Sequence, residues 1–469
     1  MWEATTTLVL EVKSTKSITL GSGKLKLGLK SFVDQLWTIN VSGPNLVEQR
    51  RILVEFLWHF SSHLMRVFVS PLAPLRYPGD GRSPIAQEVA IGPKKQPAMQ
   101  VTLKAVDGAP STLRMWDPVN QGADSTVPNV LFVPGTAVSH LIFASPYMPE
   151  NAIEHFTAKG YSCWCLTTRF GKQNHPDPPH AWTSYDARFD IAAALTYIKY
   201  YNAGSSSTSR APYIIAHCSG SLALATALLD GTVDKTSLSG LTASQSFLHP
   251  ILQPLNETKA RLPLTKLYRL IAGGWLSLDI TRQQSSQSLV QSALDALLRF
   301  YPLSSRREIC TSSVCHRCNL VFGRLWNHAN LNKATHDNLH HVFGDVSAVC
   351  MEHLALSGKK RAVIDRSGKS MSTEEGLRRL KGIPMFLFSG SDNNIYHASS
   401  TVKTWRVLEA RGEMVRRCDF EGLGHLDCWM SEKAAAPGGV YETVEAEVHR
   451  VMRGREEGKP EGNVNGETT

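Results

Sequence analysis

The sequence lacks the features that mark several specialised classes of protein. Nine cysteines in 469 residues are too few for a disulfide scaffold. No Gly-rich dinucleotide-binding motif and no internal repeat is present. No nucleic-acid-binding motif accompanies the net charge of +9, so we interpret that charge as part of a solvated surface. We therefore expect neither a cofactor nor a nucleic-acid partner.

Targeting and membrane signals are also scarce. The first residues lack the basic-then-apolar order of a signal peptide, and residues 466–469 are not a peroxisomal address. Residues 51–69 are strongly apolar, but Glu55 and Arg66 are among the polar residues that interrupt them. This pattern predicts an amphipathic helix packed on the body of the protein, and a helix that lies on a membrane surface is the less favoured alternative. We expect a cytoplasmic protein with reduced thiols, and the oligomeric state stays open.

One stretch indicates chemistry. Residues 213–216 are apolar and predict a buried strand, and residues 222–229 predict a helix. The small residues between them are typical of a nucleophile elbow, in which a sharp turn lifts one reactive side chain above a sheet. Cys218 is our preferred nucleophile because Ala216 and Gly220 would then occupy the two crowded positions. Ser219 is the alternative, although His217 is bulky for such a position. A further alternative is an ordinary turn in which the cysteine packs as a small hydrophobe.

Two later loops supply partners for such a nucleophile. Asp392 follows the predicted strand 383–388, and His425 follows the predicted strand 414–420. The chain order nucleophile, acid, histidine is that of the α/β hydrolases. Each residue taken alone has an ordinary structural interpretation, such as a turn-forming aspartate or a histidine paired locally with Asp427. Together they predict a Cys-His-Asp triad at the carboxyl ends of the strands.

An acyl-transfer site also needs donors for an oxyanion. The N–H of Ser219 is the first candidate, and Thr136 or Ala137, after the predicted strand 130–133, supplies the second. The helix that begins near Gly220 places its positive end at the nucleophile. We expect this helix end, together with a protonated catalytic histidine, to lower the pKa of the thiol.

Other histidines and cysteines allow more than one interpretation. Residues that could line the substrate pocket are His140, His217, His328 and His336. The spacing of Cys310, Cys315 and Cys318 matches no paired Cys-x2-Cys motif. We therefore expect packing in a cap, or neighbouring thiols, in place of a zinc site.

The alternation of strands and helices predicts an α/β-hydrolase fold, a mostly parallel sheet flanked by helices. Asp190 is placed to cap a helix over residues 191–201. The expected parts are an N-terminal extension and linker (1–95), the first part of the core (96–245), an inserted helical cap (246–380), the second part of the core (381–453) and a disordered tail (454–469).

Three stretches resemble a known family: AHCSGSLALATALLDG, ICTSSVCHRCNLVFGRLWNHANLNKATHDNLHHVFG and EGLGHLDCWM. They are similar to the α/β-hydrolase domain that fungal and bacterial proteins carry, in some cases fused behind a cholesterol-oxidase-like (GMC) flavin domain. The flavin half is absent here. TTRFGKQNH and GHLDC are more distantly similar to acid lipases, which implies roles for Asp392 and His425. Acid lipases have serine where this chain has Cys218, a departure that argues against simple lipase activity.

The resemblance implies a bulky apolar substrate, such as a sterol, terpenoid or polyketide ester, and a role in fungal secondary metabolism. We expect an acyl-enzyme that acts on an ester, lactone or thioester, by hydrolysis, acyl transfer or cyclisation. Two alternatives stay open. One is a non-covalent cyclase or isomerase that uses His425 as its base, and the other is a non-catalytic protein that binds a hydrophobic ligand.

Overall fold

The structure is a computed structural model. It describes residues 89–119, 127–171, 182–203, 211–262, 265, 274–278, 295, 298, 310 and 312–457. The predicted helix over residues 51–69, and nearly all of the predicted N-terminal extension, lie outside the described residues. Among the helices that the structure describes, none combines the length and the apolarity that crossing a membrane requires.

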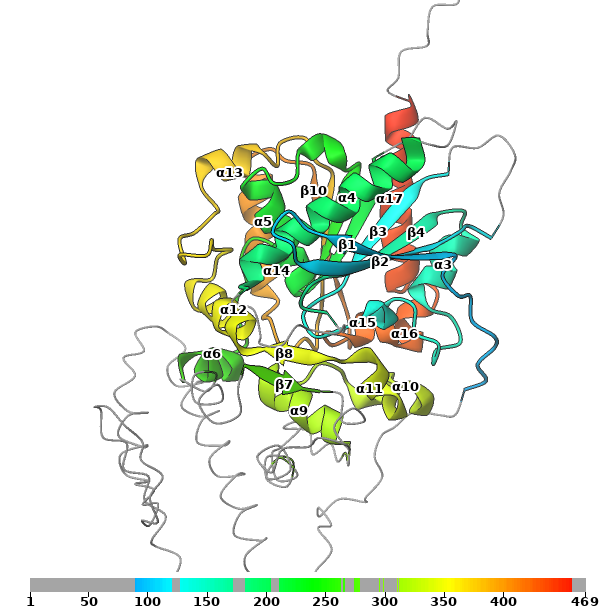
Figure 1. Ribbon diagram of the computed structural model, residues 1–469, viewed down its shortest axis with the longest axis vertical. Helices are drawn as coiled ribbons and strands as arrows, with labels where there is room; N and C mark the ends of the chain where they lie inside the picture. Colours follow the sequence, from blue (N-terminus) through cyan, green and yellow to red (C-terminus); the bar gives the residue numbers. More distant parts are fainter. Residues whose placement is uncertain are drawn as a thin grey trace, which may run out of the picture. The chain divides into compact units, whose positions relative to one another are not determined.

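The core is an eight-stranded sheet with the order β1-β2-β4-β3-β5-β6-β9-β10 (Figure 1). Its strands are β1 (Met99–Lys104), β2 (Pro110–Trp116), β3 (Asn129–Val133), β4 (Ser162–Thr167), β5 (Tyr213–His217), β6 (Gly240–Ser244), β9 (Met385–Gly390) and β10 (Val415–Phe420). β1 and β2 pair antiparallel with each other, and β2 pairs antiparallel with β4. From β4 to β10 every pairing is parallel.

Burial along the strands follows their place in the sheet. Every residue of β3, β5, β6 and β9 is buried, as expected for central parallel strands that are covered by helices on both faces. β1 at one edge and β10 at the other contain exposed residues between more buried ones. The apolar runs of the sequence therefore form the central strands of the sheet.

The helices of the core connect these strands. They are α3 (Ala152–Ala158), α4 (Arg188–Ala203), α5 (Ser219–Leu229), α14 (Ser399–Glu409), α15 (Asp427–Met430), α16 (Glu432–Ala435) and α17 (Val440–Glu457), with short 3-10 turns η1 (His140–Ile142), η2 (Ser184–Ala187) and η3 (Lys235–Ser237). α5 is buried along its whole length, next to α4. A mostly parallel sheet of this order, with a tight turn from β5 into α5, is the α/β-hydrolase fold.

Between β6 and β9 the chain forms the cap. It contains α6 (Pro254–Arg261), β7 (Trp275–Ser277), α9 (Ser313–Val321), η4 (His328–Asn330), α10 (Lys333–Asp337), α11 (Leu339–Val342), β8 (Asp345–Ser347), α12 (Ala348–Lys360) and α13 (Glu374–Arg378). The cap is not purely helical, because β7 and β8 pair as a small antiparallel sheet. In Figure 1 the elements from β7 to α12 gather at one end of the main sheet.

The cap covers the loop that follows β3. The N–H of Ser139 donates to the carbonyl of Val342 at 2.9 Å, and the N–H of Gly344 donates to the carbonyl of Ala137 at 2.9 Å. Val138 and Phe343 form an isolated antiparallel bridge. This part of the cap is therefore hydrogen-bonded to the predicted oxyanion loop.

Two local predictions are corrected. Asp190 does not cap a helix, because α4 already begins at Arg188 and Asp190 lies in its first turn. Its buried carboxylate accepts hydrogen bonds from the N–H and the guanidinium of Arg169, which is itself fully buried. The chain also stays helical beyond Gly454, since α17 continues to Glu457.

Candidate active site

Cys218 occupies the turn between β5 and α5 in a backbone conformation that is rare for residues other than glycine. Its φ is 57° and its ψ is −124°. Such a left-handed residue stores strain that the surrounding structure must hold in place, and strained residues of this kind concentrate at functional sites. Ser219, the alternative nucleophile, is the first residue of α5, and its Oγ lies 2.8 Å from Oγ1 of Thr136.

Gly220 permits the tight approach of this turn to β3. A Cβ atom at this position would lie 2.5 Å from the carbonyl oxygen of Pro134 and 2.6 Å from that of Val133. Both contacts are with backbone, so a side chain could be accommodated only if the turn and the strand moved apart. Glycine is thus needed two positions after Cys218, because the neighbouring backbone leaves no room for a side chain.

His425 reaches the same place from the loop after β10. One ring nitrogen of His425, one of His217 and Sγ of Cys218 all lie within 4.8 Å of one another. His425 is 1% exposed, and its ring centroid is 4.8 Å from that of His217. A thiol and two imidazoles therefore meet at the carboxyl ends of β5 and β10, where ligands of open α/β sheets bind.

The residue next to the predicted acid contacts the ring of His425. Nδ1 of His425 lies 3.2 Å from Oδ1 of Asn393, a buried residue in the loop after β9. Asp392, the predicted acid, is the preceding residue and is only half-buried, with its N–H donating to the carbonyl of Leu423. Within the loop identified from the sequence, the described hydrogen bond to His425 belongs to the amide side chain of Asn393, and the role of Asp392 stays a prediction.

The contacts of Asn393 assign the tautomer of His425. Nδ2 of Asn393 donates to Oε1 of Gln245 at 2.8 Å, and Oδ1 accepts the N–H of Ile395 at 2.9 Å. Because Oδ1 is an acceptor, Nδ1 of His425 must carry the hydrogen. Nε2 then keeps its lone pair, and it is the ring nitrogen left to accept a proton from Cys218.

Gln245 ties together the two loops that carry Asn393 and His425. It follows β6 and has a φ of 75°. Its Nε2 donates to the carbonyl of His425 at 3.1 Å, while its Oε1 accepts from Asn393 and from the N–H of Gly390 at 3.2 Å. One buried amide thus fixes the relative position of the base and of the residue that orients it.

His217 lies at the end of β5 beside the proposed nucleophile. It is fully buried, and its Nδ1 is 2.7 Å from Oγ of Ser244. Burial, reinforced by the neighbouring His425, lowers the pKa of His217 well below 6.5. Two imidazoles in such contact do not carry charge together, so His217 is neutral at pH 7.

Burial also sets the protonation of Cys218 and His425. It raises the pKa of the Cys218 thiol to about 12, against smaller opposing effects of hydrogen bonds from Ser219 and Tyr396. It lowers the pKa of His425 to about 3. The expected lowering of the thiol pKa by the helix end and a protonated histidine is therefore wrong, because desolvation outweighs both. The resting pair is a neutral thiol and a neutral imidazole.

The candidate oxyanion donors are not equivalent. The N–H of Ala137 donates to the carbonyl of Phe170 at 2.6 Å, so this group is already in use. Thr136 is buried next to Ser219, and its Oγ1 lies 3.9 Å from Sγ of Cys350 at the start of α12. Because the N–H of Ala137 is engaged, Thr136 stays our candidate for the second donor.

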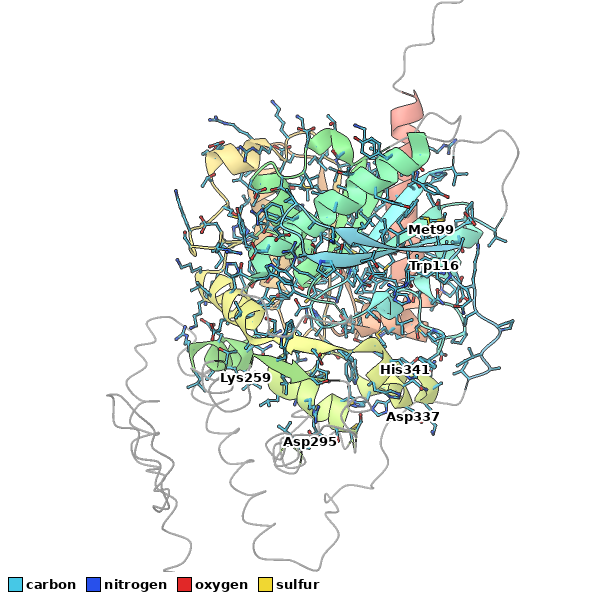
Figure 2. All side chains as sticks on the ribbon, viewed as in Figure 1. Met99, Trp116, Lys259, Asp295, Asp337 and His341 are labelled. Atoms are coloured by element: carbon cyan, nitrogen blue, oxygen red, sulfur yellow. The ribbon has the colours of Figure 1, made fainter. Side chains whose placement is uncertain are left out.

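The other histidines predicted to line the substrate pocket have partners of their own. His140 packs against Trp116, with ring centroids 6.0 Å apart, and Figure 2 labels Trp116 at the end of β2. His328 and His336 belong to a cluster with two cysteines of the cap, and their place in the substrate pocket stays a prediction. Asp427 accepts from Nδ2 of Asn330, which is a different partner from the local pairing with His425 considered above.

Three residues of the site were not found from the sequence: Asn393, Gln245 and Tyr396. Gln245 directly follows β6, and Asn393 stands in the loop after the predicted strand 383–388, so position at a strand end was the available signal. Tyr396 is buried, and its hydroxyl hydrogen-bonds Cys218. We find no sequence signal that singles out Tyr396.

No protein-family model and no curated protein sequence matches the chain. Solved structures that are similar include a soluble variant of monoglyceride lipase from Saccharomyces cerevisiae, with 13% identity over 81% of this chain and 99% of that one and a TM-score of 0.48. A thermophilic esterase from Thermogutta terrifontis has 12% identity over 76% and 99%, with a TM-score of 0.41. An epoxide hydrolase from Vigna radiata has 13% identity over 75% and 98%, with a TM-score of 0.42. These identities are too low to transfer a function.

Proposed function

We propose that the protein is an acyl-transferring α/β-hydrolase-fold enzyme with Cys218 as nucleophile and His425 as general base. The observation that carries the proposal is the convergence of a strained, left-handed cysteine and a histidine whose tautomer leaves Nε2 as a proton acceptor. In this proposal Asn393 orients His425, in the place that the sequence suggested for Asp392. The substrate class is an ester, lactone or thioester of a bulky apolar metabolite.

The reaction begins from neutral groups. Nε2 of His425 takes the thiol proton while Sγ of Cys218 attacks the substrate carbonyl, and the C–S bond forms as the carbonyl π electrons move to oxygen. The N–H groups of Ser219 and Thr136 donate to this oxyanion. Collapse expels the alcohol or thiol, which takes the proton back from His425. The product is a thioester on Cys218.

A second nucleophile completes the cycle. Water, an alcohol, an amine or a group within the same acyl chain attacks the thioester, with His425 again accepting its proton. Cys218 leaves as the thiol, so that hydrolysis, transfer and ring closure share the same first half-reaction. The identity of the acceptor distinguishes them.

The test is intact-protein mass after brief exposure to an activated apolar acyl ester. We expect an added acyl mass on Cys218 that hydroxylamine removes, that Ser219→Ala retains and that Cys218→Ala lacks. Full turnover by Cys218→Ala would refute the proposal, and an adduct lost only in Ser219→Ala would assign the nucleophile to Ser219. Turnover by the wild type without any adduct would favour the non-covalent cyclase, and tight ligand binding without turnover, unchanged in His425→Ala, the binding protein.

A further inference from the structure

The cap contains a second cluster of reactive side chains. Four buried residues from separate elements each direct one donor atom to a common point, and these atoms lie within 4.8 Å of one another: Cys310, Cys315, His328 and His336. Cys315 is on α9, His328 begins η4 and His336 is on α10. From this geometry we infer a tetrahedral Cys2His2 metal site, and the ion that suits it best is Zn²⁺.

The distances fit the edges of a zinc tetrahedron. Nε2 of His336 lies 3.3 Å from Sγ of Cys310 and 3.2 Å from Sγ of Cys315. Nε2 of His328 lies 3.6 Å from Sγ of Cys315. Zinc bonds of about 2.3 Å to sulfur and about 2.0 Å to nitrogen place the two atoms about 3.5 Å apart in a tetrahedron. Thiolate and imidazole donors of this geometry select zinc over harder cations.

The close approach of the ring nitrogens to more than one sulfur argues against simple thiol–imidazole hydrogen bonds. Separate hydrogen bonds would pair each sulfur with one ring, whereas Nε2 of His336 lies close to both sulfurs and Sγ of Cys315 lies close to both rings. A central ion accounts for all these approaches at once. Four ligands from the protein close the site, which is typical of structural zinc.

The surroundings resemble the outer shell of a metal site. The N–H of Ser312 donates to Sγ of Cys310 at 3.3 Å, and Nδ1 of His336 faces Oδ1 of Asp337 at 3.6 Å, slightly longer than a hydrogen bond. Ligating histidines commonly direct their second nitrogen to a carboxylate, which fixes the ring. Figure 2 labels Asp337 in the cap, at the C-terminal end of α10.

The spacing of the ligands supports the same conclusion. The residues follow Cys-x4-Cys-x12-His-x7-His. The first two intervals are within the Cys2His2 zinc-finger pattern of Cys-x2–4-Cys-x12-His, and only the last is longer than its usual 3–5 residues. The expectation of cap packing without a metal considered paired Cys-x2-Cys motifs, which this pattern does not contain.

The site has a structural connection to the catalytic loop. Leu325, close to His328 in sequence, accepts hydrogen bonds from the N–H groups of His425 at 3.1 Å and Leu426 at 2.7 Å. Nδ2 of Asn330 donates to the carbonyl of Gly422 at 2.7 Å. An ion that holds His328 therefore also holds the segment against which the His425 loop is hydrogen-bonded.

The experiment measures the metal content of the full chain, produced without a metal-affinity tag and purified without chelators. We expect about one zinc per chain by elemental mass spectrometry, and loss of most of it in Cys315→Ala and His336→Gln. Cys318→Ala is the matched control, because Cys318 is buried on the same helix, three residues further on, but is not among the four ligands. It should keep its zinc.

Replacement by Co²⁺ supplies a second readout. A tetrahedral Cys2His2 site should give the intense visible bands of thiolate-bound cobalt, and a mercurial reagent should release the zinc of the wild type without any substitution. Wild-type protein that holds no zinc and takes up no cobalt would overturn the inference. So would a mass lower by two hydrogens that reports a Cys310–Cys315 disulfide, or a Cys318→Ala variant as depleted of zinc as Cys315→Ala.

Discussion

Replacing Asn393 should separate the role of this residue from that of Asp392. The Asn393 side chain makes the described hydrogen bond to Nδ1 of His425, at 3.2 Å in a buried site. Asn393→Ala leaves that N–H without its partner, which costs about 1–3 kcal/mol. If the transition state loses the same free energy, kcat falls roughly 5- to 150-fold.

The matched variant is Asp392→Asn, which keeps the size of the side chain and the backbone hydrogen bond to Leu423. We expect a smaller loss of kcat than in Asn393→Ala, because Asn393 is buried and holds Nδ1 of His425 whereas Asp392 is only half-buried. The assay is single-turnover acylation by an activated apolar ester, with thermal unfolding measured in parallel to identify folded protein. A folded Asn393→Ala enzyme with wild-type kcat would refute the reasoning, as would a larger loss in Asp392→Asn.

Four further predictions concern protonation, packing and the amide between the two loops. Burial lowers the pKa of His425 to about 3 and raises that of Cys218 to about 12. Between pH 6.5 and 3 the unfolded chain binds more protons at this histidine than the folded chain does. The contribution of His425 to the free energy of unfolding is therefore full above about pH 6.5 and is lost as the pH falls towards 3. Acid unfolding followed by circular dichroism can measure this loss. Alkylation of Cys218 by iodoacetamide should keep accelerating above pH 9 and not level off near neutrality; a plateau at pH 7 would mean a thiolate. Gly220→Ala should destabilise the fold by about 1–3 kcal/mol in denaturant titration, whereas Gly92→Ala, with open space around it, should not. Gln245→Leu removes the amide between the two loops and should cost about 1–3 kcal/mol of stability along with most of the activity; wild-type kinetics would contradict its positioning role.

The sequence was sufficient for the parts of the fold that depend on local pattern. Buried strands are continuous apolar runs, and the turn after β5 is marked by small residues, so the positions of Cys218 and His425 could be read from their neighbours. The direction of a side chain within a loop could not be predicted in this way. Asp392 and Asn393 are adjacent, and which of them faces His425 depends on how the loop folds after β9.

Contacts between segments that are distant in the chain also could not be predicted from the sequence. Gln245 acquires its role only because the loops after β9 and β10 both pass its side chain. His328 and His336 were expected near the substrate, since a histidine in a cap gives no sign of which neighbour it faces. Their actual partners, Cys310 and Cys315, come from another part of the cap.

The burial of Cys218 and His425 affects how charge develops in the reaction, and the sequence motifs alone do not indicate this effect. In the reaction that we propose, Cys218 and His425 are both neutral at rest, so proton transfer and attack on the substrate create charge together. The imidazolium and the oxyanion then form in a poorly hydrated place, so fixed donors contribute more to the rate than they would in water. The N–H of Ser219 lies at the start of α5, where the helix dipole favours negative charge, and the cap is hydrogen-bonded to the predicted oxyanion loop. The helix end that does not ionise the thiol at rest is thus placed to stabilise the charge that appears during the reaction.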